Sequence, residues 1–166
     1  MKLKSLYEDV ALSAFGKELR KLLRSNEAMQ ILNSDSESNG SGWNDGGCYV
    51  LAKSLQELIP SSELWGIFRE GGTGIDGKAD HFIVKVGNTF YDGDGGSNTQ
   101  QIIKRMYGDN PNLQNLVAKR ASEKDVHPDT PSGRSLIDQI KSYLLKQGEN
   151  NYLFGNQLHK FSNQWQ

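Results

Sequence analysis

The chain lacks the residues that mark several common classes of protein. It has a single cysteine among 166 residues, so no disulfide can form within the chain, and a reducing compartment is expected. No apolar run approaches the ~18 residues that a membrane-spanning helix needs, and no apolar signal segment is visible near residue 1. We therefore expect a cytoplasmic protein that does not enter a membrane.

The chain also lacks an excess of charge of one sign and a cluster of metal-ligating residues. The 19 basic and 20 acidic residues leave a formal net charge of −1, which provides no broad positive surface for nucleic acid. Lys17, Arg20, Lys21 and Arg24 are predicted to lie on the solvated face of a helix. One cysteine and three scattered histidines form no cluster with metal-ligand spacing, so neither a metal nor another cofactor is expected.

Apolar residues recur at helical spacing in some segments and alternate in others, which predicts an α+β protein. The predicted helices are 6–24, 48–59, 97–107, 112–119 and 132–147, and the predicted strands are 63–70, 81–86 and 89–92. Polar or glycine-rich segments at 33–47 and 71–79 are expected to be loops, and 148–166 has no assignment. We expect one domain over 1–166, with N-terminal helices on a small antiparallel sheet and further helices towards the C-terminus.

The lone cysteine, Cys48, follows the loop sequence Trp-Asn-Asp-Gly-Gly and begins a helical pattern. A helix N-terminus favours negative charge, so it lowers a thiol pKa and increases the nucleophilic thiolate. Gly46 and Gly47 allow tight or left-handed backbone angles and the close approach of a substrate carbonyl. The Cys48 backbone N–H, with a second donor from Asn44 or the glycine loop, is then placed to stabilise an oxyanion. The alternative is a small buried cysteine without chemistry.

A histidine and two acids lie on the predicted hairpin that follows. His81 begins an apolar strand, and a polar side chain at a strand end can reach a cleft, where it serves as the general base for the thiol. Asp92 and Asp94 close the next strand, and either carboxylate can accept from the imidazole and fix its tautomer. The alternatives are a structural histidine that caps the sheet and acids of an ordinary Asp-Gly turn.

The hairpin register bears on which acid meets His81. A two-residue turn between the strands places His81 directly opposite Asp94 and diagonal to Asp92, with all three on one face of the sheet. Register alone therefore favours Asp94. Gly93 and Gly95 are expected to bend the chain out of regular pairing, which favours Asp92. Asp92 is the predicted orienting acid, with Asp94 as the second choice and otherwise part of a substrate or oxyanion subsite.

Cysteine, histidine and acid thus come in this order, at a helix start, on a strand and on the next strand. This arrangement resembles the papain-like cysteine peptidase superfamily in its broad sense, which includes NlpC/P60 and CHAP amidases, transglutaminases and arylamine acetyltransferases. The motifs are Gly46-Gly47-Cys48, Asp-His-Phe-Ile-Val at 80–84 and Phe-Tyr-Asp at 90–92, within a core of about 43–95. The resemblance, nearest to compact bacterial and phage members, implies a papain-like core and favours Asp92 as the acid. A helical extension over about 97–166 lies outside it.

The residues and the resemblance together predict a cysteine-nucleophile hydrolase. It would cleave an amide or peptide bond of a protein or peptide substrate through a Cys48 thioester, with His81 and Asp92 completing the triad. A deamidase or acyltransferase with the same triad is one alternative. A catalytically inactive papain-like module, such as a phage or effector inhibitor, is the other. The sequence does not indicate the substrate or the oligomeric state.

Overall fold

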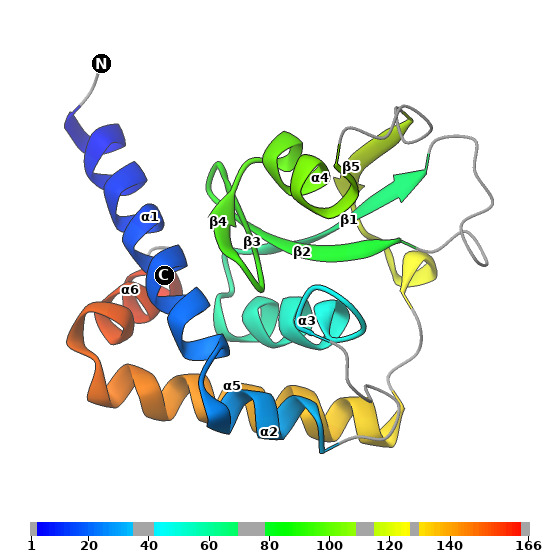
Figure 1. Ribbon diagram of the computed structural model, residues 1–166. Helices are drawn as coiled ribbons and strands as arrows, with labels where there is room; N and C mark the ends of the chain where they lie inside the picture. The colour runs from blue at the N-terminus through cyan, green and yellow to red at the C-terminus, as the bar shows by residue number, and fades with distance from the viewer. Residues whose placement is uncertain (1–2, 35–41, 70–78, 109–114, 127–129, 164–166) are drawn as a thin grey trace.

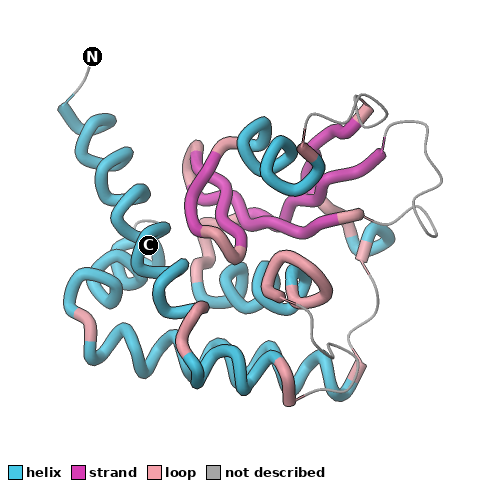
Figure 2. Tube along the Cα trace, in the orientation of Figure 1, coloured by secondary structure: helices cyan, strands magenta, loops and turns pink. Residues whose placement is uncertain are grey.

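A computed structural model describes residues 3–34, 42–69, 79–108, 115–126 and 130–163 (Figure 1). Within these ranges the chain is α+β, as predicted, with helices packed around an antiparallel sheet (Figure 2). The helices are α1 (Leu3–Leu23), α2 (Asn26–Leu32), α3 (Cys48–Leu58), α4 (Thr99–Tyr107), α5 (Pro131–Asn150) and α6 (Tyr152–Asn163). The strands are β1 (Glu63–Arg69), β2 (His81–Val86), β3 (Thr89–Asp92), β4 (Gly95–Ser97) and β5 (Leu116–Arg120), in the order β4-β3-β2-β1-β5.

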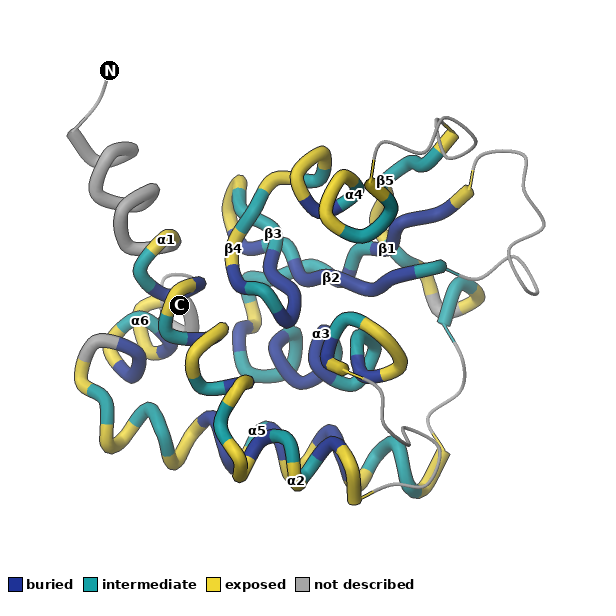
Figure 3. Tube along the Cα trace, in the orientation of Figure 1, coloured by how far each residue is buried: buried dark blue, intermediate teal, exposed yellow. Residues whose placement is uncertain are grey.

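The sheet is covered on both faces, because alternate side chains of its central strands are apolar on each side. On one face Ile67 and Ile83 meet Ile102 of α4 in a small cluster. The other face packs on α3, and the main core continues beyond α3 to α5. The buried positions accordingly concentrate in the central strands and in α3 (Figure 3). Of the N-terminal helices, α1 packs against β4, whereas α2 packs on α5.

The predicted hairpin is confirmed in its strands and in its register. Val84 pairs with Tyr91 and Val86 pairs with Thr89. The turn between the two strands begins with Gly87 at φ 58°, a left-handed angle that suits glycine. This register fixes which side chains of β2 and β3 share a face, and so it determines the neighbours of His81.

The predicted helix at 112–119 is wrong where the structure describes it. Residues 116–120 form β5, which pairs antiparallel with β1 and places Val117 opposite Phe68. Unpaired backbone groups of β1 would otherwise lie at the sheet edge, so this pairing overrides a weak local helical pattern. Residues 112–114 lie outside the described part of the chain. The sequence reading also missed α2, β4 and α6, which are short or rich in polar residues.

An ionic cluster joins α3 to α5 and holds the helix that carries Cys48. The Glu57 carboxylate accepts two hydrogen bonds from Arg134, at 2.6 and 2.7 Å, and one from Lys141 at 2.8 Å. Arg134 also bonds Asp138 one turn further along α5. The hydrogen bonds from Arg134, with those from Lys141, outweigh desolvation and lower the pKa of Glu57 to about 2.

We expect Glu57→Gln to lower the free energy of unfolding at neutral pH by about 1–2 kcal/mol, after allowance for solvent screening of a partly exposed pair. The folded-state pKa lies below the ordinary value, so this stabilisation is present above about pH 4.5 and is lost as the pH falls towards about 2. Urea unfolding of both proteins between pH 7 and 3 measures it. Glu27→Gln, which removes an exposed pair with Lys146, is the control and should change little. A difference that does not shrink on acidification contradicts the assignment.

Candidate active site

Cys48 is the first residue of α3, and a compact loop fixes its position. Trp43 is buried and donates from Nε1 to the carbonyl of Leu23 at 2.8 Å, which anchors the loop to the end of α1. A Cβ on Gly47 would lie 2.8 Å from Leu32 Cδ1 and 3.1 Å from the Gly42 carbonyl oxygen, so a larger residue there would require these neighbours to shift. Gly46 adopts the left-handed φ of 85° that was expected for the loop. These contacts place Cys48 at the N-terminus of α3.

Some of the hydrogen-bond donors that were expected to stabilise an oxyanion instead hold this loop in its conformation. The backbone N–H of Gly47 donates to the carbonyl of Gly42 at 3.2 Å, so it supports the turn itself. The side chain of Asn44 donates to Asp94 Oδ2 and accepts from the backbone N–H of Gly93, both at 2.8 Å. Asn44 therefore ties the cysteine loop to the turn after β3. The N–H of Cys48 lies in the first turn of α3, where backbone donors have no partner within the helix.

His81 begins β2 and is fully buried. The strand enters the sheet beside β1, where the Asp80 N–H donates to the Ile67 carbonyl at 2.8 Å. His81 Nε2 lies 3.5 Å from Asp92 Oδ2, and the imidazole also interacts with the side chain of Cys48. Neither ring nitrogen has a hydrogen bond of good geometry to any residue in the described ranges. Long contacts of this kind are common in resting catalytic sites and shorten when substrate binds.

The Cys48 thiol and the His81 imidazole shift each other's pKa values in the directions that favour an ion pair. Burial alone lowers the pKa of His81, but Asp92 and Cys48 raise it to about 9. Burial raises the pKa of the Cys48 thiol, yet His81 and the backbone N–H groups of Phe82 and Tyr49 lower it further than burial raises it. Both shifts favour the charged forms of the two groups, the thiolate and the imidazolium.

Of the two candidate acids, Asp92 is the one that faces His81. Its side chain is buried, and its Oδ1 accepts from the backbone N–H of Asp94 at 2.9 Å. The regular pairing that would set Asp94 opposite His81 ends before it, because Gly95, at φ 94°, turns the chain back into β4. Asp94 instead contacts Asn44, Arg24 and Arg105.

Three arginines contact the two acids, and the sequence reading missed this role. Arg105 of α4 donates to Asp92 Oδ2 and pairs through Nε with Asp94 Oδ2 at 3.0 Å. Arg20 of α1 pairs with Asp94 at 3.8 Å, and Arg24, in the turn after α1, pairs with it at 3.0 Å, although both were predicted to lie on a solvated helix face. Nothing in the local pattern indicates these pairs, since each depends on how α1 and α4 pack on the sheet.

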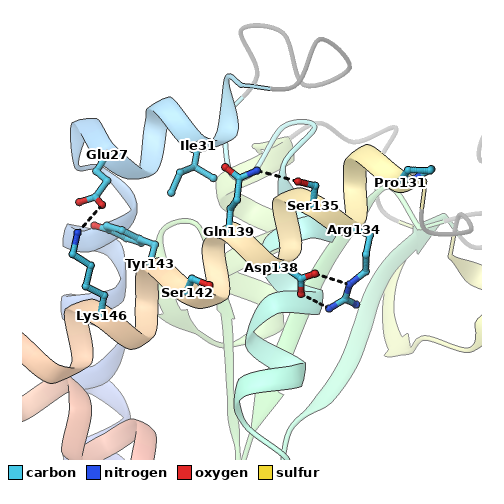
Figure 4. Close-up of a pocket in the computed structure, with 10 residues that line it drawn as sticks. All are labelled: Glu27, Ile31, Pro131, Arg134, Ser135, Asp138, Gln139, Ser142, Tyr143 and Lys146. Atoms are coloured by element: carbon cyan, nitrogen blue, oxygen red, sulfur yellow. Dashed lines mark hydrogen bonds and ion pairs between the residues drawn. The ribbon is translucent and has the colours of Figure 1, made fainter.

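Outside this group of residues, the described part of the chain has an exposed histidine and an open groove. His159 is exposed on α6, and His127 lies outside the described part of the chain. A shallow open groove runs between α2 and α5, lined in part by Glu27, Ile31 and Tyr143 (Figure 4). The residues that line this groove do not include Cys48, His81, Asp92 or Asp94.

Among the residues that the structure describes, no group of three His, Cys, Asp or Glu side chains is arranged to hold a metal ion. No helix within the described ranges has the length and apolar character to cross a membrane. Comparison of the chain with protein-family models, curated proteins and solved structures finds no match. The geometry of Cys48, His81 and Asp92 is therefore the feature that bears most directly on function.

Proposed function

We propose that this protein is a cysteine hydrolase of the papain-like kind, which cleaves an amide or peptide bond through a thioester on Cys48. The observation that carries the proposal is the convergence of a helix-start cysteine, a buried histidine and a buried acid, with the thiol and imidazole shifted towards an ion pair. Perturbed, mutually paired groups of this kind are a feature of catalytic sites. A buried cysteine without chemistry does not require a buried imidazole beside it.

The proposed reaction has two stages. In the first, the Cys48 thiolate attacks the substrate carbonyl carbon, the His81 imidazolium gives its proton to the leaving amine, and the carbon–nitrogen bond breaks to leave a thioester. In the second, neutral His81 takes a proton from water, the hydroxide oxygen attacks the thioester, and the carbon–sulfur bond breaks. The thiolate and the imidazolium are thereby restored. Asp92 stays ionised throughout and holds the imidazole tautomer.

Selective alkylation of Cys48 tests the ion pair without a known substrate. Because this is the only cysteine, the rate with iodoacetamide reports one site. We expect rapid alkylation well below the pH of about 8.5 at which an ordinary thiol is half ionised. His81→Gln should move the midpoint of the pH–rate curve upward, because it removes the cation that lowers the pKa of the thiol.

His159→Gln is the matched control, since it removes an exposed histidine far along the chain, on α6. Its alkylation curve should match that of the unmodified protein. A midpoint at or above the ordinary thiol value in the unmodified protein contradicts the proposal and favours an inactive binding module. An unchanged midpoint in His81→Gln also contradicts it, because the thiolate would then not depend on the imidazole.

A further inference from the structure

The Asp92 carboxylate is held by more than the imidazole that it faces. It is 2% exposed, and a buried carboxylate without a firm partner would lose its charge. The backbone N–H of Asp94 binds one oxygen at 2.9 Å. The other oxygen faces His81 at 3.5 Å and also accepts a hydrogen bond from Arg105. Two cations, one permanent and one titratable, therefore share a single oxygen.

Arg105 reaches this oxygen from a rigid base. The helix α4 begins with a capping box in which Asn98 and Gln101 bond each other's backbone, and Ile102 fixes the helix to the sheet. The guanidinium bridges the turn between β3 and β4, with Nε 3.0 Å from Asp94 and an end nitrogen 3.4 Å from Ser97 Oγ. The planar fork of arginine suits this bridging, because its donors are fixed relative to each other.

We propose that Arg105 is a positioning residue of the active site, which holds Asp92 against His81 and keeps the carboxylate ionised through both stages of the reaction. This inference rests on the proposed function. Without Arg105, Asp92 would have a cationic partner only while His81 is protonated. When His81 gives its proton to the leaving amine, the buried carboxylate would then be unpaired. The permanent charge of Arg105 removes this cost from the proton-transfer step.

Because Arg105 and His81 contact the same oxygen of Asp92, Arg105 should have a measurable effect on the pKa of His81. Arg105 offsets part of the negative charge of Asp92, so it moderates how strongly His81 holds its proton. Removing the guanidinium should raise the pKa of His81 above its value of about 9. Six titratable or charged groups surround this imidazole. They are Cys48 of α3, Arg69 of β1, Asp80 just before β2, Asp92 of β3, and Arg105 and Tyr107 of α4.

The test is an NMR titration of His81 in the full chain labelled with ¹³C-histidine, with the signal assigned by its absence from His81→Gln. Arg105→Met should raise the midpoint by about one pH unit, as expected for loss of a charge a few ångströms beyond Asp92. Arg105→Lys keeps the charge and should shift it much less. Arg105→Gln repeats the neutral substitution in case the methionine variant does not fold, as judged by circular dichroism.

Arg24→Met is the matched control, because Arg24 pairs with Asp94 without touching Asp92. It should leave the midpoint in place. A midpoint in the neutral Arg105 variants that stays within about 0.3 unit of the unmodified protein, or falls, overturns the inference. An equal shift in Arg24→Met also overturns it. Failure of the proposed function would show separately, as a slow thiol in the unmodified protein.

Discussion

Replacing Cys48 with alanine should abolish amide hydrolysis while the protein remains folded. The thiolate is the atom that attacks the substrate, and loss of the nucleophile in a triad costs about 10⁶-fold in kcat. The change removes one sulfur from a half-buried position at the start of α3 and leaves the anchoring of the loop by Trp43 in place. We therefore expect a change of about 1 kcal/mol or less in the free energy of unfolding.

The measurement has two parts, because the substrate is not known. A fluorogenic peptide-amide library first identifies a peptide that the unmodified protein cleaves, and Cys48→Ala is then compared on that peptide. Thermal unfolding of both proteins checks the fold. Ser54→Ala is a suitable control, since it removes a single oxygen from a buried position two turns along the same helix, where the hydroxyl bonds Val50 and Ile137 carbonyls. Equal activity in Cys48→Ala and the unmodified protein would exclude the thioester mechanism.

The parts of the site that follow from local pattern could be predicted from the sequence. The glycine loop before an apolar periodic segment places a cysteine at a helix start, and α3 begins at Cys48. Alternation around a glycine-containing turn gives the hairpin, whose register is confirmed. These features depend on neighbours within a few residues, so the sequence carries them directly.

The contacts between distant segments could not be predicted. Arg105 reaches Asp92 only because α4 packs on the face of the sheet opposite α3. Arg24 meets Asp94 because α1 packs against β4. The strand β5 owes its conformation to pairing with β1 rather than to its own sequence, which was mistaken for a helix. Long-range packing thus decides the surroundings of the triad, whereas local pattern decides its members.

Substitution of the two acids by their amides should separate their roles. Asp92→Asn removes the charge that holds the imidazole tautomer, and the new amide can present its N–H group to His81 in place of an acceptor. In the best-studied triad the equivalent change lowers kcat by about 10⁴-fold with the geometry intact. Asp94→Asn leaves the carboxylate facing His81 unchanged and weakens the contacts of Asp94 with Asn44 and with the three arginines. A loss of about tenfold or less is expected.

Both variants are to be measured on the same peptide amide across pH, together with thermal unfolding. Asp92→Asn should also bring the alkaline limb of the rate curve below about pH 9, because the carboxylate is one of the groups that raise the pKa of His81. Asp94→Asn should leave that limb nearly in place. A severe loss in Asp94→Asn with a mild loss in Asp92→Asn would reverse the assignment. Mild losses in both would indicate that Cys48 and His81 act as a dyad and that the buried carboxylate serves the fold.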